Sequence, residues 1–341
     1  MANTNKFMNV LVAGGCGFVG SNICINLKKR NFNVLSVDNI SKKYCKLNVQ
    51  RLKKFKIRNI KVDIANEKEL NKIKFKADLI IDCAAEPAVE ISFKEPQKVL
   101  RNNLITTLNL LNIARKNNSN FIFLSSSRIY PMSISYNYFK SKNKKLYSEK
   151  TSTKGVKTIY GFSKYSSEML IEEFSYLFGI NFIINRLGLT SGPWQFGKVE
   201  QGLISLWMWR HIKKQKLKYI GFGGTGNQIR DVLDIDDLND LIYLQIKNMK
   251  KIKNQTFCVG GGKKSYFKLK NLTNYCSKIT KNKINIAKSS KTSKNDIPYY
   301  VTSNSKLKKF YNWQPKFTLF KTLEKIYFWM KKNESKLEEY F

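Results

Sequence analysis

The stretch that decides the fold is VAGGCGFVGSN, residues 12–22, because it spaces three glycines at intervals of three: Gly14, Gly17 and Gly20. It lies at the end of a strand-like run, Asn9–Gly15, and leads into a helix candidate, Ser21–Arg30. In that context the first glycine permits a tight turn, the second lets backbone N–H groups approach a pyrophosphate, and the third lets the helix pack on the sheet. The helix N-terminus then faces the phosphates with its partial positive charge. The pattern predicts a dinucleotide site.

Short apolar runs continue along the chain, and each has the β-branched, uninterrupted character of a buried parallel strand. These runs are Asn9–Gly15, Phe32–Asn39, Asn59–Ile64, Asp78–Ala85, Asn120–Ser127, Asn181–Leu187 and Gln255–Gly262. Helix candidates lie between them at Ser21–Arg30, Pro96–Asn117 and Ser163–Phe178. Repeated βα units predict an α/β fold, a Rossmann-type doubly wound parallel sheet.

Two segments, 188–230 and 263–341, do not follow that alternation and hold the tryptophans. We expect them to form a smaller substrate-binding lobe at the carboxyl ends of the strands, where such sheets bind ligands. Residues 1–187 and 231–262 are expected to form the Rossmann domain. The polar, lysine-rich segment Ser133–Lys157 is expected to be a solvated excursion or a loop near the site.

Composition narrows the class of protein. No apolar run approaches the roughly 20 residues of a membrane span. The chain enters its first strand within ten residues, which leaves no room for a signal peptide and favours the cytoplasm. The six cysteines have no metal-site spacing and are expected to be reduced and mostly buried. The single histidine, His211, excludes a histidine triad or metal cluster and is expected on a helix surface; no metal site is predicted.

The net charge of +38 raises the question of an anionic partner. Only nine of the 62 basic residues are arginine, and the lysines are spread over the whole length. Proteins that bind nucleic acid favour arginine and gather their basic residues in one surface patch, so the charge pattern argues against a nucleic-acid partner. A positive field that attracts a small diphosphate fits the pattern better.

Asp38 ends the second strand, eighteen residues after Gly20. A carboxylate at that position accepts hydrogen bonds from a ribose diol and repels a 2′-phosphate. The glycine loop and Asp38 together therefore predict that the dinucleotide is NAD rather than NADP.

Two further motifs supply candidate catalytic groups. SSSRIYP, Ser125–Pro131, follows the fifth strand, and KTIYGFSKYSSEML, Lys157–Leu170, places Tyr160 and Lys164 four residues apart, on one side of a helix. A lysine ammonium lowers the pKa of a nearby phenol, so Tyr160 can act as a base. The hydroxyl of Ser126 can position a sugar oxygen. This set suits the interconversion of an alcohol and a ketone.

These motifs resemble the extended short-chain dehydrogenase/reductases that act on nucleotide sugars, and the resemblance covers nearly the whole chain. Besides the motifs above, it rests on "VDI" at Asp63, "CAA" at Cys83–Ala85, "NNLITTLNLL" at Asn102–Leu111, "RDVLDIDDL" at Arg230–Leu238 and the late "NWQP". The resemblance implies that Ser126, Tyr160 and Lys164 are catalytic, that Asp63 contacts the adenine and that Arg230 grips a diphosphate. The cofactor-binding residues it implies are Gly14, Gly17, Phe18, Val19, Gly20, Asp38, Asn39, Asp63, Ile64, Ala84, Ala85, Asn103, Tyr160 and Lys164.

The resemblance also bears on the reaction. The 4,6-dehydratases of the family carry an Asp-Glu pair where this chain has Ser127 and Arg128, which disfavours dehydration. Residues 186–202 and 221–238 are most similar to epimerases that invert the 2-position of a CDP-3,6-dideoxyhexose through a ketone. By that similarity the substrate contacts are Glu86, Ser127, Arg128, Gln195, Gln201 and Arg230.

Several departures from the family leave alternatives open. Pro131 replaces a usual glycine, Thr106 stands where a glycine is common, and Glu86-Pro87 differs from related enzymes. The alternatives are a UDP- or GDP-hexose 4-epimerase, an NAD(P)-dependent reductase or dehydrogenase, and a Rossmann-type binding protein without catalysis. Members of the family commonly form dimers through two long helices, so a homodimer or homotetramer is expected.

Overall fold

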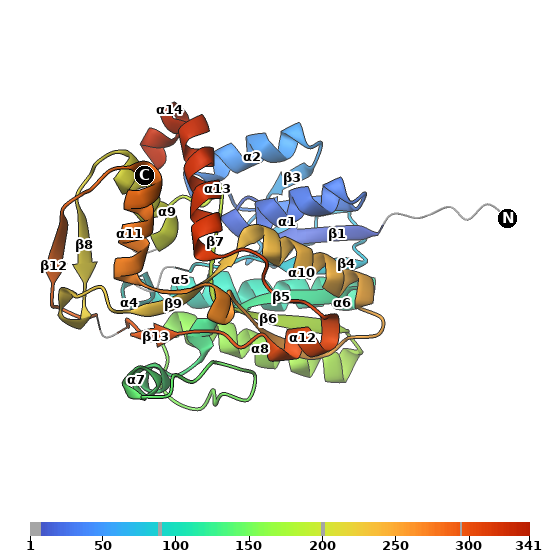
Figure 1. Ribbon diagram of the computed structural model, residues 1–341. Coiled ribbons are helices and arrows are strands. Elements are labelled where there is room, and N and C mark those ends of the chain that lie inside the picture. Colours follow the sequence, from blue (N-terminus) through green and yellow to red (C-terminus); the bar gives the residue numbers. More distant parts are fainter. Residues whose placement is uncertain (1–7, 88–90, 199–201, 294) are drawn as a thin grey trace.

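Seven parallel strands form one sheet in the computed structural model, which describes residues 8–87, 91–198, 202–293 and 295–341 (Figure 1). The strand order is β10-β6-β5-β4-β1-β2-β3. The strands are β1 (Asn9–Ala13), β2 (Asn33–Asp38), β3 (Arg58–Lys61), β4 (Leu79–Asp82), β5 (Asn120–Ser126), β6 (Phe182–Leu187) and β10 (Gln255–Val259). Each overlaps one of the seven apolar runs, which confirms the predicted doubly wound parallel sheet.

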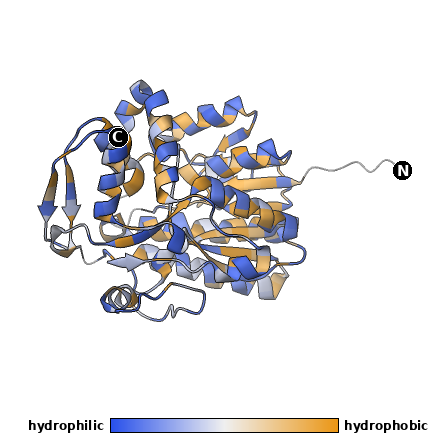
Figure 2. Ribbon diagram, in the orientation of Figure 1, coloured by the Kyte–Doolittle hydropathy of each residue, from blue (hydrophilic) through white to orange (hydrophobic). Residues whose placement is uncertain are grey.

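Helices cover both faces of this sheet. Alternate residues of β1 point to opposite sides: Val10 packs with α1 (Phe18–Lys29) and α10 (Ile235–Asn248), and Leu11 packs with α6 (Thr106–Asn117) and α8 (Ile159–Phe178). The central strands are largely hydrophobic, whereas the covering helices carry both hydrophilic and hydrophobic residues (Figure 2).

The helix boundaries differ from the predicted ones at functionally important points. The first helix begins at Phe18, directly after the glycine loop, and not at Ser21. The predicted helix Pro96–Asn117 consists of α5 (Pro96–Leu100), a π-helical turn η1 (Arg101–Ile105) and α6. Helix α8 begins four residues early, at Ile159, because Thr158 caps it by accepting a hydrogen bond from the Gly161 N–H.

The remaining strands form two small sheets. One contains β7 (Leu189–Ser191), β9 (Ile229–Asp234), β11 (Tyr266–Lys268) and β13 (Tyr299–Tyr300), and the other pairs β8 (Leu217–Ile220) with β12 (Ile286–Ser289). Helices α9 (Leu203–Ile212), α11 (Leu269–Thr280) and α13 (Leu319–Lys332) share a core with Trp207 and Trp209. Figure 1 shows α9, α11, β8 and β12 on the left, beyond the end of the large sheet.

The other helical segments are short. They are α2 (Cys45–Lys54), α3 (Glu67–Leu70), α4 (Ile91–Lys94), α7 (Met132–Lys140), α12 (Ser305–Tyr311), α14 (Glu334–Leu337), η2 (Ser127–Ile129), η3 (Phe222–Gly224), η4 (Gly262–Lys264) and η5 (Glu338–Tyr340). Of the predicted Rossmann segment 231–262, β10 joins the large sheet, whereas β9 lies in the four-stranded sheet. The predicted division into lobes stays a prediction.

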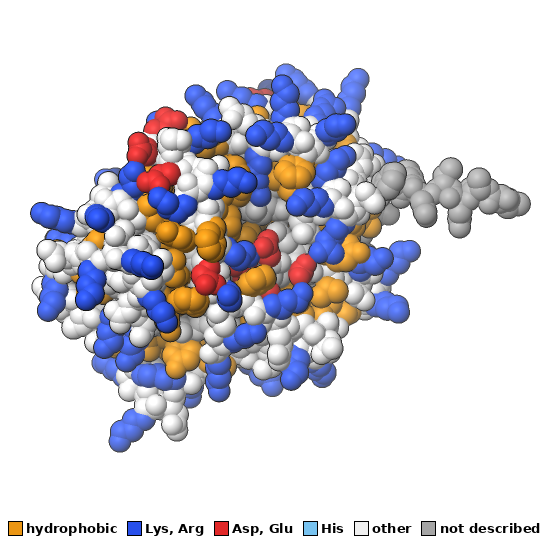
Figure 3. Space-filling view, turned by 45° about the horizontal axis from the view of Figure 1, so that its top comes forward, with side chains coloured by type: hydrophobic (Ala, Val, Ile, Leu, Met, Phe, Trp, Pro, Cys, Tyr) orange, Lys and Arg blue, Asp and Glu red, His pale blue; other side chains and the backbone are white. Residues whose placement is uncertain are grey.

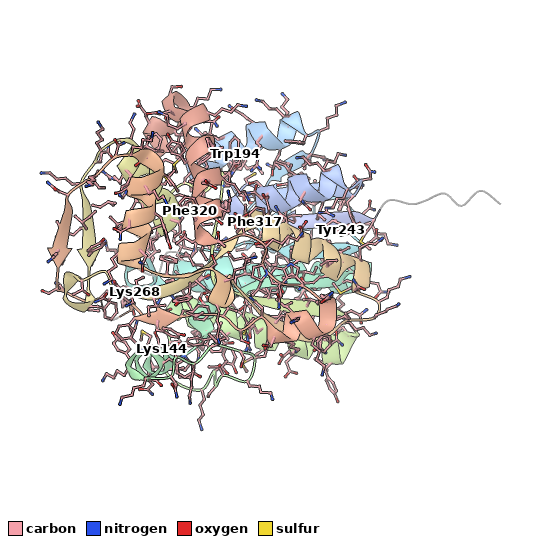
Figure 4. The ribbon with its side chains drawn as sticks, viewed as in Figure 1. Lys144, Trp194, Tyr243, Lys268, Phe317 and Phe320 are labelled. Carbon is pink, nitrogen blue, oxygen red and sulfur yellow. The ribbon has the colours of Figure 1, made fainter. Side chains whose placement is uncertain are left out.

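Contacts between side chains that are far apart in the sequence hold neighbouring segments of the fold together. Arg30, at the end of α1, stacks 4.0 Å from the ring centre of Tyr243 on α10 and donates to Asp240 at 2.8 Å. Arg51 of α2 stacks 4.5 Å from the ring centre of Trp194. Figure 4 labels both aromatic residues, which lie above different parts of the sheet.

The expectation for His211 is wrong, and the expectation for the segment 133–157 holds only in part. His211 is fully buried in α9, where its Nδ1 lies 2.7 Å from the Trp207 carbonyl oxygen and burial lowers its pKa. Within 133–157, α7 is a regular helix and Tyr147 is only 1% exposed, paired with Thr302. Helix α7 and Tyr147 are therefore packed against the body, whereas residues 142–145 are exposed. Ser135 and Tyr147 also line the small pocket that contains Arg128, which agrees with the second alternative, a segment near the site.

The basic side chains are spread over the surface, as they are spread along the sequence. Lys and Arg side chains are scattered over the face seen in Figure 3 and do not gather in one patch. All six cysteines are free and all but Cys83 are buried, as expected. Among the helices in the described ranges, none combines the length and apolar character that crossing a membrane requires.

Candidate active site

The glycine loop forms the floor of the site. Gly14 adopts a positive φ of 69°, and its N–H donates to the Val37 carbonyl at 2.9 Å. A Cβ on Gly14 would lie 2.9 Å from the Ala84 Cα, and a Cβ on Gly20 would lie 2.2 Å from the Gly14 carbonyl oxygen. Only glycine allows these close approaches. Gly17 is the N-cap of α1, whose first turn carries no acidic residue, so the helix N-terminus is free to attract phosphates.

A cavity of about 300 Å³ opens above this loop, along the carboxyl ends of the strands. The cavity is lined by residues at the carboxyl ends of β1, β2, β3, β4 and β5 and by the first turns of α8. Of the predicted cofactor residues, those that line it are Gly14, Gly17, Phe18, Val19, Gly20, Asp38, Asn39, Asp63, Ile64, Ala84, Ala85, Tyr160 and Lys164. The predicted set therefore comes together in one place, apart from Asn103.

Asp38 lies at the end of the cavity formed by β2. Its two carboxylate oxygens accept from the Cys16 N–H at 3.0 Å and the Ile40 N–H at 2.7 Å. Burial raises the pKa of Asp38, and these two backbone donors oppose the rise. Each oxygen keeps acceptor capacity for a second donor. A fixed carboxylate at a strand end suits the two hydroxyls of a ribose.

Asp63 marks the adjoining part of the cavity. One of its oxygens pairs with the Arg101 guanidinium at 2.6 Å, and the other accepts from the Ala65 N–H at 3.0 Å. The carboxylate is held at the position predicted for the adenine.

Asn103 has a different place from the one predicted. It is 1% exposed and does not line the cavity. Its Oδ1 accepts from the Glu86 N–H at 2.7 Å, and its Nδ2 donates to the Ser163 Oγ at 2.8 Å, which donates to the Tyr160 carbonyl at 2.8 Å. The Asn103 amide therefore joins the loop after β4 to the start of α8.

Ser126 and Tyr160 line the cavity on the side of β5, and two strands, β4 and β1, separate β5 from the Asp38 strand β2. Ser126 is the last residue of β5, and Tyr160 lies in the first turn of α8, 8% exposed. Burial raises the pKa of the Tyr160 phenol, while a hydrogen bond from Ser126 and the positive charge of Arg128 lower it. The backbone of Arg128 is fixed here, since its N–H donates to the Ser126 Oγ at 3.1 Å.

Lys164 lies one turn further along α8 and is 2% exposed. Its Nζ is 3.4 Å from the Ala84 carbonyl oxygen and 4.4 Å from the ring centre of Phe123. Burial lowers the pKa of Lys164, and the nearby Asp82 raises it. The positive group that acts on the Tyr160 phenol in this arrangement is Arg128, so the expected help from Lys164 stays a prediction.

The six predicted substrate contacts lie in different places. Glu86 lines the cavity, and its Oε2 pairs with the Lys42 Nζ at 2.6 Å. Ser127 and Arg128 line a smaller neighbouring pocket, outside the dinucleotide cavity. Gln201 falls outside the described residues.

Two arginines converge on the segment 295–297. Arg128 Nη1 donates to the Asn295 carbonyl at 2.8 Å, and Arg230 Nη2 lies 3.3 Å from Asp296 Oδ1 and also donates to the Ile297 carbonyl. Burial lowers the pKa of Arg230 to about 10, although Asp296 opposes the shift. These guanidinium groups come from separate elements and suit an anionic ligand.

Gln195 is occupied within the protein. Its Oε1 accepts from Ser191 at 2.7 Å and Ser205 at 3.0 Å, and its Nε2 donates to the Thr190 carbonyl at 2.9 Å. This network fixes the turn after β7, so Gln195 serves the fold of the lobe in this structure.

Sequence reasoning did not identify several residues at the cavity. Lys42 and Tyr44 follow β2, and Gly188 and Thr190 follow β6. Gly188 follows β6 directly, so the signal that pointed to the other lining residues was available for it; Lys42 and Tyr44 lie four and six residues after β2, and Thr190 lies in β7.

Comparisons with known proteins agree with this geometry. The model of the family described as "NAD dependent epimerase/dehydratase family" matches residues 10–260. The chain is 26% identical to CDP-paratose 2-epimerase of Salmonella typhi, over 94% of this chain and 99% of the relative. It is 27% identical to a putative UDP-glucose 4-epimerase of Methanocaldococcus jannaschii, over 95% and 99%.

A solved structure is similar over nearly the same length. It is UDP-glucose 4-epimerase from Thermotoga maritima with UDP-glucose, with a TM-score of 0.82, 26% identity, and coverage of 96% of this chain and 100% of that one. The family's dependence on NAD confirms the predicted cofactor, and the glycine cradle, the free helix N-terminus and the Asp38 carboxylate fit it. The chain belongs to the NAD dependent epimerase/dehydratase family.

Proposed function

We propose that this protein is a nucleotide-sugar epimerase that uses bound NAD. The observation that carries the proposal is that one cavity is lined by Ser126 and Tyr160 on the side of β5 and by Asp38 at the end of β2. NAD supplies reversible acceptance of a hydride when it is bound. The protein's own task is to hold the sugar carbon, remove its hydroxyl proton and return that proton after the ketosugar has turned.

Tyr160 is the proposed base. In its ionised form the phenol oxygen takes the proton of the sugar hydroxyl, and Ser126 holds the same sugar oxygen by a hydrogen bond. Burial raises the pKa of Tyr160, and the Ser126 hydrogen bond and the positive charge of Arg128 oppose that rise, so both groups favour the ionised form.

The residues after Ser126 favour epimerisation over dehydration. Ser127 and Arg128 stand where related dehydratases have an acidic pair. The Arg128 guanidinium donates to the Asn295 carbonyl and cannot deliver or receive a proton near neutral pH. Loss of a second hydroxyl therefore has no acid to assist it at these positions.

The substrate we favour is a CDP-3,6-dideoxyhexose that is inverted at the 2-position. The similarity to CDP-paratose 2-epimerase over 94% of the chain supports it. Arg230 and Arg128 are proposed to receive the diphosphate, with Asp296 released from Arg230 as the anion arrives. The alternatives are inversion at the 4-position of a UDP-hexose, and a reductase or dehydrogenase that releases the reduced cofactor.

A homodimer or homotetramer in the cytoplasm is the proposed form of the protein. Apolar side chains on α8 support the assembly, because Met169 is 52% exposed and Leu177 63% exposed. Paired α6 and α8 helices from two copies would cover both.

The test is turnover of a panel of CDP-, UDP- and GDP-sugars, followed by nuclear magnetic resonance of the sugar ring without added cofactor. We expect inversion of one CDP-sugar by the wild type and none by Tyr160→Phe, with Tyr165→Phe on the same helix as the matched control. Retention of near-normal turnover by Tyr160→Phe contradicts the base assignment. A requirement for stoichiometric added cofactor contradicts epimerisation and favours a dehydrogenase.

A further inference from the structure

One ion pair at the cavity has no part in the proposed chemistry. Lys42 lies in the loop after β2, Glu86 lies in the loop after β4, and the Nζ of the first is 2.6 Å from the Oε2 of the second. Both residues line the dinucleotide cavity. The Glu86 side chain is 5% exposed and that of Lys42 is 35% exposed, so the pair faces the cavity on one side and solvent on the other.

The order of strands shows what the pair crosses. In the sheet β1 lies between β4 and β2, and the glycine loop follows β1 directly. A bond between the loops after β2 and β4 therefore passes over the carboxyl end of β1. A dinucleotide that reaches from Asp38 on β2 to Ser126 on β5 has to pass the same point, with its pyrophosphate at the N-terminus of α1.

The Glu86 side of the pair has a rigid base. Its N–H donates to Asn103 Oδ1 at 2.7 Å, and Asn103 is linked through Ser163 to the first turn of α8. The Lys42 side belongs to a loop and carries a flexible, partly exposed stem. Opening of the pair therefore requires movement of Lys42 alone.

The Lys42 ammonium compensates the negative charge of the buried Glu86 carboxylate. Among the described residues, the second carboxylate oxygen of Glu86 is buried without a hydrogen-bond partner, so loss of Lys42 would leave a buried carboxylate uncompensated. That cost holds the pair closed and slows any passage beneath it.

We propose that the Lys42–Glu86 ion pair forms a roof over the dinucleotide and sets the rate at which the cofactor leaves. The roof concerns the exchange of NAD and does not depend on which sugar is inverted. An epimerase gains from it, because the same bound cofactor serves each cycle.

The test measures the release of NAD itself. Protein loaded with radiolabelled NAD is chased with excess unlabelled NAD, and the label retained on the protein is followed over time. We expect Lys42→Met and Glu86→Gln each to speed release by about tenfold. The double variant is expected to release NAD no faster than either single variant, because either change alone opens the roof.

The matched control is Lys43→Met. This neighbouring lysine pairs with Glu339 at 2.8 Å on the surface, where both side chains are more than half exposed, so release should be unchanged. Lys42→Met changes a partly exposed side chain and Glu86→Gln removes the buried charge itself, so either variant can serve as the test if the other folds poorly. Release within twofold of wild type in Lys42→Met overturns the proposal. Multiplying effects in the double variant also overturn it, since they make Lys42 and Glu86 independent contacts of the cofactor.

Discussion

Replacement of Glu168 on α8 should destabilise the fold at the point where it supports the catalytic groups. The Glu168 carboxylate accepts from Arg186 Nε at 3.1 Å and Nη2 at 2.8 Å, and from the Ser125 hydroxyl. Ser125 precedes the proposed catalytic Ser126, and Glu168 lies two turns after Tyr160. The cluster therefore fixes β5 against α8.

The magnitude follows from burial. The side chains of Glu168 and Arg186 are 3% and 11% exposed, and Glu168 raises the pKa of Arg186. Glu168→Leu leaves the guanidinium buried with Tyr130 as its remaining side-chain partner, at 3.4 Å. Removal of one partner of a buried pair costs about 3–5 kcal/mol. That is a large part of the stability of about 5–15 kcal/mol that is typical of a domain.

The assay is unfolding in urea, followed by circular dichroism, for three variants. Glu168→Leu should lower the free energy of unfolding by the amount above, and Glu168→Leu with Arg186→Met should lower it by less, because no charge is then stranded. Glu173→Leu, exposed on the same helix, should change it by less than about 0.5 kcal/mol. A loss below about 1 kcal/mol in the first variant, or a larger loss in the double variant, refutes the reasoning.

Three further predictions concern the site. Asp38→Ala should weaken NAD binding and reduce the preference for NAD over NADP in a titration with each cofactor, and an unchanged preference counts against the ribose role. Arg128→Met should move the rising limb of the pH–rate profile to higher pH, because the Tyr160 phenol must lose its proton and the Arg128 charge lowers the pKa of that phenol; a limb that stays in place excludes that influence. Gly20→Ala should yield protein without bound NAD on chromatography of the released nucleotide, since the new Cβ would lie 2.2 Å from the Gly14 oxygen, and full NAD content would contradict the role of this glycine.

The sheet could be predicted because its inner strands are short apolar runs, although the edge strand β3 is mostly polar and none of its residues is buried. The cavity could be predicted because parallel strands end at one edge. Side-chain amides were harder to assign. Asn103 and Gln195 were expected at the ligands, but they bond to partners up to 60 residues away within the protein. A sequence does not reveal which of two partners an amide takes.

The helix α7 escaped prediction for a similar reason. Its sequence leads into a polar, lysine-rich stretch, and its burial rests on contacts such as Ser135 with the Tyr299 carbonyl, 164 residues further on. His211 was placed on the surface from its basic neighbours, whereas it is fully buried in α9. Local composition is a poor guide where the packing partners lie far along the chain.

The central claim is that a sugar carbon loses its hydrogen to bound NAD beside Tyr160 and regains the same hydrogen on the other face. The most direct measurement is to let the enzyme invert its nucleotide-sugar substrate in D₂O and to examine the product by nuclear magnetic resonance and mass spectrometry. We predict no deuterium at the inverted carbon, because the hydrogen never enters the solvent. One deuterium per product molecule at that carbon would mean inversion by exchange with water and would contradict the account.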